Sequence, residues 1–240
     1  MAQATLLSIV QNFCRRRGLP VPGSVMSSQD DMYLQIAGLM DEGIESMLTG
    51  FSWQQLQYIT TFTSVAAESQ GTLTTLCPEG FLSIINETIY DRTRRLPIYG
   101  PKTPQEWEML QALTPTGPLY QFRILQDSLR IFPTMPAGHT LAFEYNSEYA
   151  IYNPVDLVYK KFFTKDTDEF LLNDTLKLKW LTWRWLSVKG FPYAEEQRLY
   201  EEYLGDLRSK NKAKATLSLA GDVKTIRPGI LVPAGSWSIP

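Results

Sequence analysis

The sequence predicts an α+β protein with a helical bundle body, an inserted antiparallel β subdomain and an extended C-terminal arm. Three observations lead to this fold class. Apolar residues recur at helical spacing near both ends of the chain, within residues 5–48 and 174–212. Threonine, aromatic and β-branched residues are frequent between these segments, which is typical of strands. Residues 213–240 mix proline and glycine with apolar side chains and fit neither pattern.

The chain of 240 residues is long enough to bury a substantial core, with or without an inserted subdomain. We expect residues 1–52 to supply the N-terminal helices of the body. Residues 53–155 should form a mainly β insertion with a short helix near residues 104–113. Residues 156–212 should then return to the body as its last helices, and residues 213–240 should form an arm that docks on a partner.

Two helices are expected in the N-terminal segment. The first runs from about Thr5 to Arg17 and ends where Gly18 permits a left-handed cap. The second is expected to begin after Ser28, with Asp31 completing a capping box, and its apolar repeat continues to Leu48. The regular apolar stripe of this second segment predicts a core helix.

The insertion is expected to contain several strands and one helix. Tyr58–Val65 has the composition of a strand, and Gly71–Cys77 is a second candidate. Phe81–Tyr90 is compatible with either a strand or a short helix. Residues 103–106 form a capping box with proline at the first helical position. Three more strands are expected to form a meander with one buried face: Tyr120–Leu125, Leu129–Phe132 and Thr140–Tyr145.

The last two helices differ in their apolar faces. Asp174 or Thr175 is expected to cap the first of them, whose apolar arc is so wide that it needs two neighbours. We interpret its tryptophans as packing at a domain or subunit contact: Trp180, Trp183 and Trp185. The final helix, from Tyr193 to about Lys212, is expected to turn its acidic side chains outward: Glu195, Glu196, Glu201 and Glu202.

The chain offers few groups for catalysis, and we expect no catalytic, metal or cofactor site. His139, the single histidine, is expected to be a solvated turn residue. Cys14 and Cys77 have no histidine near them in the sequence and are expected to be free thiols. The acids within residues 166–169 lack the remaining ligands of a calcium loop, so we expect them to begin a helix.

The charge balance argues against a protein whose main affinity is for phosphate backbones, because the formal net charge is -2 at pH 7. Arg92, Arg94 and Arg95 lie in an expected loop, and we interpret them as solvated surface or as a lining of a DNA channel. We find neither an apolar run of membrane length nor the residue order of a signal peptide. We therefore expect a soluble protein.

The C-terminal arm is unusual because it combines irregular structure with apolar surface. It contains one acidic residue, Asp222, and a set of large apolar side chains: Ile226, Ile230, Leu231, Val232, Trp237 and Ile239. Segments without stable structure are normally polar, because apolar surface favours burial. Fully extended, the arm would reach on the order of 90 Å. We therefore expect it to dock on another chain.

The order of these segments resembles that of the head-to-tail adaptor proteins of tailed bacteriophages, including the tail tubular protein A type of short-tailed phages. The resemblance spans about residues 28 to 212 and depends on the shared order of several weak motifs. These motifs are the Asp31–Leu48 helix followed by Phe51-Ser52-Trp53, Leu96–Gly100 followed by Thr103–Trp107, Phe122–Ile124, Leu129–Pro133, Pro136–Gly138, Leu141–Tyr145, Asp168–Leu172, the tryptophan-rich helix, Lys189-Gly190 and the helix from Tyr193.

The resemblance implies a virion structural protein of the tail or neck, made in the host cytoplasm. Such a protein forms a homo-oligomeric ring, usually a dodecamer, beneath the portal protein, and contacts the tail tube or nozzle protein on its other side. DNA passes through the ring without specific binding. The resemblance also implies that the C-terminal arm runs along the portal and that the protein is not an enzyme.

Three other functions remain open from the sequence. The chain could be a tail tube or nozzle subunit that touches the adaptor and never the portal. A tail-associated cell-wall hydrolase would use Glu195 or Glu201 as its acid. A nucleic-acid-binding module would use Arg92, Arg94 and Arg95 and would show strongly salt-dependent affinity for DNA.

Overall fold

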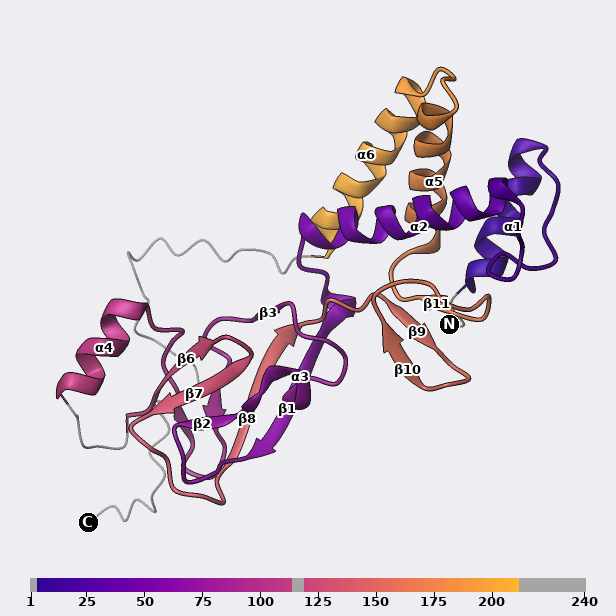
Figure 1. Cartoon of the computed structure of the whole chain (residues 1–240). Helices are drawn as coiled ribbons and strands as arrows, with labels where there is room; N and C mark the ends of the chain where they lie inside the picture. Colours follow the sequence, from indigo (N-terminus) through magenta and orange to yellow (C-terminus); the bar gives the residue numbers. More distant parts are fainter. Residues whose placement is uncertain (1–3, 114–118, 212–240) are drawn as a thin grey trace, which may run out of the picture.

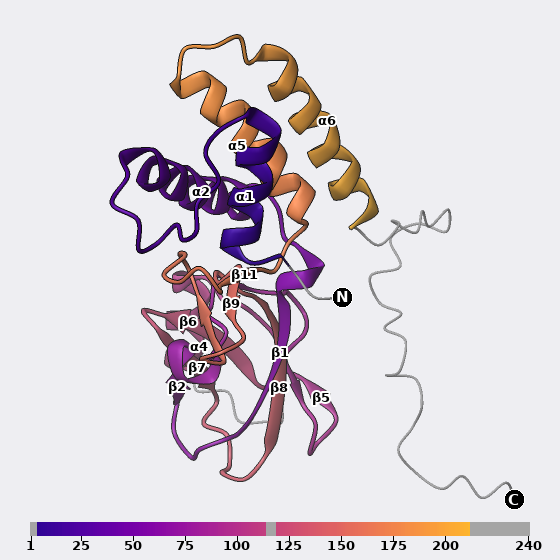
Figure 2. The same cartoon turned by 90° about the vertical axis from the view of Figure 1, so that its right-hand side faces the viewer.

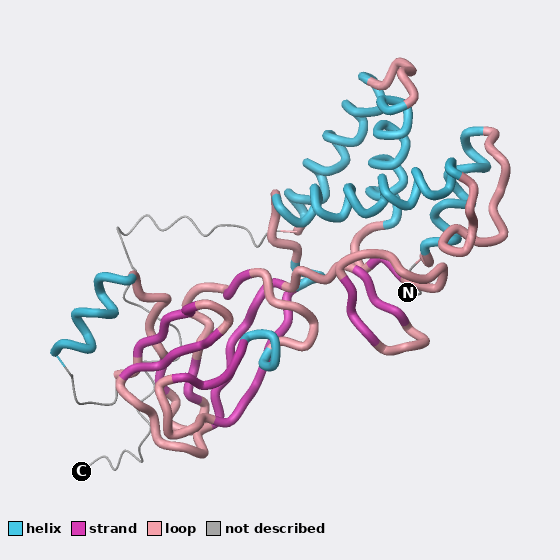
Figure 3. Tube along the Cα trace, in the orientation of Figure 1, coloured by secondary structure: helices cyan, strands magenta, loops and turns pink. Residues whose placement is uncertain are grey.

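The computed structural model describes residues 4–113 and 119–211 of the 240. Within these ranges, six α-helices and antiparallel sheets give a mixed fold compatible with the α+β class. Four longer helices lie in one part of the molecule and two sheets lie in the other (Figure 1). The same division is visible from the side (Figure 2), and the trace shows that a narrow set of connections joins the two parts (Figure 3).

Helix α1 spans Leu6–Arg17, as the sequence predicts. The Thr5 hydroxyl accepts a hydrogen bond from the Ser8 backbone at 3.3 Å, and Gly18 follows the last turn in the left-handed conformation. These two residues satisfy backbone groups that a helix leaves free at its ends. The buried face of the helix consists of Leu6, Ile9, Val10, Phe13 and Cys14.

Helix α2 spans Asp31–Thr49, but its cap is not the expected one. The Asp30 carboxylate accepts a hydrogen bond from the Met32 backbone at 2.9 Å. Ser28 instead accepts a bond from the Asp30 backbone at 3.2 Å, so the predicted cap at Ser28 is wrong. Aspartate and serine cap equally well, and the two candidates lie close together in sequence.

Helices α5 and α6 follow the insertion and span Asp174–Val188 and Ala194–Lys210. The predicted cap of α5 at Asp174 or Thr175 is wrong, because Asn173 accepts the bonds from the first turn. Helix α5 contacts α1, α2 and α6. Its wide apolar arc is therefore covered by helices of the same chain.

The insertion contains two antiparallel sheets. The larger has the order β1-β8-β4-β5, with β3 also paired to β8, and the smaller has the order β2-β7-β6. Their bounds are β1 Gln57–Thr63, β2 Ser69–Thr72, β3 Ser83–Ile84, β4 Tyr90–Asp91, β5 Leu96–Pro97, β6 Gln121–Leu125, β7 Ser128–Phe132 and β8 Thr140–Asn146. Strand β8 is central because it pairs with β1 along one edge and with β3 and β4 along the other.

The predicted meander of β6, β7 and β8 is wrong in its pairing. Strands β6 and β7 form a hairpin, but the other edge of β7 is occupied by β2, and β8 belongs to the larger sheet. The connection over residues 133–139 is long enough to let the chain cross from one sheet to the other. The predicted buried face is confirmed for most of its residues, because Phe122, Leu129, Ile131, Leu141, Phe143 and Tyr145 are buried.

Two further segments of the insertion differ from the expectation. Gly71–Cys77 was expected to be a strand, but β2 ends at Thr72, whose hydroxyl caps the short helix α3, Leu73–Leu76. Phe81–Tyr90 contains β3 and the start of β4, so its strand alternative is correct in part. The predicted helix near residues 104–113 is α4, Pro104–Leu113. In its capping box, Glu106 accepts from the Thr103 backbone at 2.9 Å.

A third, small sheet has the order β10-β9-β11. Its strands are β9 Ile151–Asn153, β10 Val158–Lys160 and β11 Glu169–Phe170. Strands β10 and β11 lie within residues 156–212, for which the sequence predicts the C-terminal helices of the body. Strands of two or three residues carry no alternation that sequence analysis could detect. The small sheet lies beneath α1 and α2 (Figures 1 and 2), and the Leu6 backbone donates to the Asp168 carbonyl at 2.8 Å.

The molecule has two apolar cores. One is made by residues between Leu6 and Leu56 together with residues between Ala150 and Tyr200, and it lies among the helices and the small sheet. The other is made by residues between Leu73 and Tyr145, and both larger sheets contribute to it. The two ends of the described chain therefore share one core, and the residues between them build the second.

Gly43 and Gly38 of α2 provide a test of the helical packing. A Cβ at Gly43 would lie 2.4 Å from Trp180 Nε1, whereas a Cβ at Gly38 would meet nothing within 4 Å. We expect Gly43→Ala to lower the free energy of unfolding by about 1–3 kcal/mol, because it overpacks the α2–α5 contact. Gly38→Ala should raise it by up to about 1 kcal/mol, because alanine favours the helix. Urea unfolding of both variants measures the free energy of unfolding. Equal changes in the two variants would contradict the close contact between Gly43 and Trp180.

Candidate functional site

A pocket of about 270 Å³ lies at the junction of the two parts. It is lined by residues 48–53, 56, 82–83 and 146–147, which come from the end of α2 and from the entry and exit of the insertion. The apolar wall includes Phe51, Trp53 and Leu82. On the polar side, the Ser52 hydroxyl donates to Asn146 Oδ1 at 2.5 Å and Asn146 Nδ2 donates to the Ser83 hydroxyl at 2.9 Å.

The last turn of α6 lies beside this pocket. The Arg208 guanidinium is 5.7 Å from the centre of the Phe51 ring, and a Cβ at Gly50 would lie 2.7 Å from Arg208 Nη2. Asn211 Nδ2 donates to Gln55 Oε1 at 3.3 Å. The nitrogen Nε of Arg208 is buried and has no hydrogen-bond partner among the described residues. The last described residues of α6 and the residue after it therefore contact the junction.

The predicted docking residues of the arm lie outside the described residues. They are Ile226, Ile230, Leu231, Val232, Trp237 and Ile239. Their role stays a prediction. The structure does place the end of the preceding helix, α6, next to the apolar wall of the junction pocket.

The tryptophans of α5 lie mainly inside the chain. Trp180 and Trp185 are each 6% exposed and belong to the helical core, so neither is free to pack on another subunit. Trp180 Nε1 donates to the Leu39 carbonyl at 3.1 Å. Trp183 is partly buried at the edge of that core, and a subunit contact remains a prediction for this residue alone.

Lys177 is a buried lysine in the helical core that sequence analysis missed. Its side chain is fully buried, its amino group donates to the Met40 carbonyl, and it lies 5.0 Å from the centre of the Phe170 ring. Burial lowers the pKa of Lys177 well below its ordinary value, and the charge of Asp41 opposes this only in part. Burial also raises the pKa of Asp41. A lysine between Leu176 and Leu178, inside the apolar arc, was the available signal in the sequence.

His139 is not the solvated turn residue that the sequence predicts. Its side chain is 13% exposed, and Nδ1 lies 2.7 Å from Oδ2 of Asp91, which is fully buried. An ionised carboxylate only accepts hydrogen bonds, so Nδ1 carries the proton in this pair. The second oxygen of Asp91 accepts from the backbones of Thr93 at 2.9 Å and Arg94 at 3.1 Å. His139 thus fastens the start of the β4–β5 turn.

Ser64 lies close to this pair, but the three residues do not form a catalytic triad. The Ser64 hydroxyl donates to the Pro136 carbonyl at 2.7 Å and accepts from the backbone nitrogen of His139 at 2.9 Å. A nucleophilic serine would need its hydroxyl on the free ring nitrogen of the histidine. The hydroxyl is instead committed to the backbone of the turn.

Asp166 and Asp168 organise loops and do not begin a helix, so that prediction is wrong. Asp166 accepts from the Ser24 hydroxyl and from the backbones of Val25 and Met26, both at 3.0 Å. Asp168 is fully buried and accepts from Lys160 Nζ at 2.9 Å. Among the described residues, no three His, Cys, Asp or Glu side chains gather in a way that could hold a metal ion.

The acidic residues of α6 and the two cysteines lie where the sequence predicts. Glu195 binds Arg198 at 2.8 Å on the exposed side of α6, and Glu196 binds Arg17 at 2.8 Å. Cys14 and Cys77 are free and buried. Burial raises the pKa of the Cys77 thiol to about 12, which leaves it protonated and unreactive at neutral pH.

Arg92, Arg94 and Arg95 lie in the turn between β4 and β5 and are exposed, as expected for a loop. Arg94 Nη1 donates to the Tyr120 hydroxyl at 3.2 Å.

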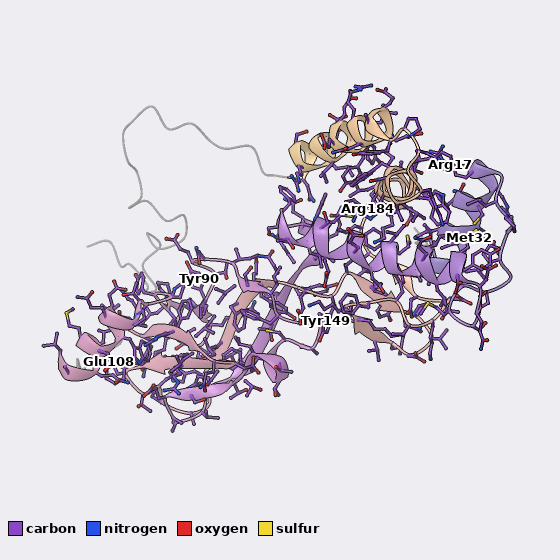
Figure 4. The ribbon with its side chains drawn as sticks, turned by 45° about the horizontal axis from the view of Figure 1, so that its top comes forward. Arg17, Met32, Tyr90, Glu108, Tyr149 and Arg184 are labelled. Carbon is purple, nitrogen blue, oxygen red and sulfur yellow. The ribbon has the colours of Figure 1, made fainter. Side chains whose placement is uncertain are left out.

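Tyr90, at the start of β4, and Glu108, on α4, mark the β part in Figure 4, whereas Arg17 and Arg184 mark the helical part.

No protein-family model matches the chain, and no curated protein matches it. In the part of the chain that the structure describes, none of the helices combines the length and the apolar character needed to cross a membrane.

Lys177→Met tests the buried lysine. Because the folded-state pKa of Lys177 is lowered, the unfolded chain binds its proton more readily. Stability should therefore rise with pH between the lowered value and the ordinary 10.5. We expect Lys177→Met to remove this rise and to be as stable as the native chain at neutral pH, or more stable by about 1–4 kcal/mol.

Urea unfolding between neutral and mildly alkaline pH measures the slope. Lys179→Met, at a partly exposed position of the same helix, is the matched control and should keep the native slope. If the stability of Lys177→Met rises with pH as steeply as that of the native chain, the lowered pKa of Lys177 is contradicted.

Asp168→Asn tests the buried carboxylate. Burial by itself would raise the pKa of Asp168, but bonds from the Thr164 backbone, Lys160 and the Lys165 backbone outweigh it, so the pKa is lowered. The carboxylate stabilises the fold above its unfolded pKa of about 3.9, and this contribution is lost as pH falls through the lower folded value. We expect the variant to lose about 3–5 kcal/mol at neutral pH, because Lys160 loses its ionic partner and the amide offers only one acceptor oxygen to the donors that bond both carboxylate oxygens.

Asp156→Asn is the control, because Asp156 pairs with the exposed Lys165 at 2.7 Å and should change stability by about 0–1 kcal/mol. Urea midpoints at pH 7 compare the two variants. Equal losses of stability in the two variants would show that the Asp168 carboxylate stabilises the fold no more than the exposed Asp156–Lys165 ion pair does.

Proposed function

We propose that this protein is a virion head-to-tail adaptor: it forms a ring that joins the portal protein to the tail and surrounds the path of the DNA. The observation that carries the proposal is the sequence of residues 213–240, which begins shortly after α6 ends and combines large apolar side chains with proline and glycine. Such a segment has affinity for a surface that the chain meets on assembly. The order of the sequence segments supports the same role.

The helical core gives this proposal a mechanical basis. Residues from both ends of the described chain meet in that core, and α6 finishes against Phe51 and Gln55 at the junction. An arm that starts from a fixed point can transmit load from the portal to the body of the adaptor.

The polar groups best suited to chemistry are occupied with structural bonds, which favours a binding role over catalysis. His139 bonds to Asp91, Asp168 forms an ion pair with Lys160, and Lys177 donates a hydrogen bond to the Met40 carbonyl. Glu195, the acid that a cell-wall hydrolase would use, is exposed and paired with Arg198. General acids in hydrolases need a raised pKa, whereas the Arg198 hydrogen bonds lower the pKa of Glu195.

The partners in this proposal are the portal protein, the tail tube or nozzle protein and further copies of the same chain, in a ring of twelve. Each of four large side chains of the arm, Ile230, Leu231, Val232 and Trp237, contributes about 1.5–3 kcal/mol when buried. Repetition around a ring multiplies the effect of individually weak contacts. A tail tube or nozzle subunit would instead cross-link through its arm to the adaptor and never to the portal.

Deletion of residues 226–240 tests the proposal. Both described cores lie within residues 4–211, so we expect the shortened protein to fold with an unchanged melting temperature. We expect it to lose binding to DNA-filled heads, measured by co-sedimentation.

Two full-length controls separate apolar docking from charge. Ile230→Ser combined with Trp237→Ser should also abolish head binding, whereas Lys224→Gln combined with Arg227→Gln should weaken it far less. Native head binding by the deletion variant would falsify the role of the arm.

A further inference from the structure

The β4–β5 turn presents three arginines from a rigid frame. Residues 92–95 connect Asp91 of β4 to Leu96 of β5, and all four are exposed. The Arg92 backbone donates to the Thr140 carbonyl at 2.8 Å, and Thr140 begins β8. Because β8 runs from Thr140 toward Asn146 at the junction, the turn lies at the end of the sheet that faces away from the helices.

The backbone of the β4–β5 turn is held in place by hydrogen bonds. Asp91 accepts from the backbones of Thr93 and Arg94 and binds His139 Nδ1 at 2.7 Å. The Thr93 hydroxyl accepts from the Thr140 backbone at 2.9 Å. A charged side chain that is already oriented loses less freedom when it binds than one on a flexible loop.

The side chains of the three arginines are not neutralised by acidic neighbours among the described residues. Arg94 lies over the Tyr120 ring at 5.9 Å, which leaves part of its planar guanidinium free for hydrogen bonds. Within residues 4–113 and 119–211, no ion pair involves Arg92, Arg94 or Arg95. By contrast, Arg17 of the other arginine cluster, residues 15–17, pairs with Glu196 at 2.8 Å. No ion pair involves Arg15 or Arg16 either, so the β4–β5 turn differs in that none of its three arginines pairs with an acid among the described residues.

We propose that Arg92, Arg94 and Arg95 form a contact site for the phosphate backbone of duplex DNA. Guanidinium groups match the geometry of phosphate oxygens and bind them without regard to base sequence. The chain has an acidic balance outside this turn, with 25 acidic and 23 basic residues in total, so the contact is local and weak. A weak, sequence-independent contact allows DNA to slide. The proposal rests on the proposed function for the presence of DNA, but its test does not require a ring.

The test compares two variants that remove the same charge. The first carries Arg92→Gln, Arg94→Gln and Arg95→Gln, and the control carries Arg15→Gln, Arg16→Gln and Arg17→Gln. The affinity of the full chain for a short duplex of mixed sequence is measured by fluorescence anisotropy as the salt concentration rises. Circular dichroism and melting temperature establish that both variants are folded.

We expect the native protein and the control to share a steep salt dependence. For the first variant, the slope of log affinity against log salt should fall by about 0.9 for each arginine that contacts a phosphate. Its affinity at low salt should fall at least tenfold below that of the control. Negligible DNA affinity of the native protein at low salt, or equal losses in both variants, would overturn the proposal.

Failure of the adaptor role gives a different result. If deletion of residues 226–240 leaves head binding intact while the β4–β5 variant alone loses DNA affinity, the DNA contact is supported without the adaptor role. If the deletion abolishes head binding while the β4–β5 variant binds DNA as tightly as the control, the DNA contact is overturned and the adaptor role stands.

Discussion

The packing of α2 against α5 is the contact on which the rest of the structure depends. Gly43 lets the Trp180 ring approach the α2 backbone, Trp180 donates to the Leu39 carbonyl at 3.1 Å, and Lys177 donates to the Met40 carbonyl. Side chains of α5 are thus bonded directly to the backbone of α2. Because these helices lie on either side of the insertion in sequence, the chain must leave the helical core and return to it at one place.

The junction that results positions the end of α6, and β8 leads from the junction to the arginine turn. The Ser147 backbone donates to the Leu56 carbonyl at 2.8 Å, and Trp53 Nε1 donates to the Met47 carbonyl at 3.0 Å, so the exit and the entry of the insertion are bonded together. On the helical side, the end of α6 lies beside Phe51. At the far end of β8, the arginine turn is held by Asp91 and His139.

Local signals in the sequence predicted most helices and strands but missed the capping residues of α2 and α5, and they predicted long-range pairing poorly. The Thr103–Glu106 capping box and Gly18 predicted where α4 begins and α1 ends, because these signals act within one turn. Strand β7 pairs with β2 along the edge that the β6–β7 hairpin leaves open. No local sequence pattern indicates which distant strand will occupy that edge. The roles of His139 and Lys177 were missed for the same reason, since their partners Asp91 and Met40 are distant in sequence. The arm lies outside the described residues and stays a prediction.

The central claim is that residues 213–240 bind a different polypeptide when the particle assembles. The most direct measurement is the mass, by native mass spectrometry, of the full chain mixed with the portal protein that we propose as its partner. The account predicts a complex whose mass equals the portal ring plus a ring of this chain. It is contradicted if an intact portal ring and this chain, mixed well above micromolar concentration, are each detected only at their separate masses.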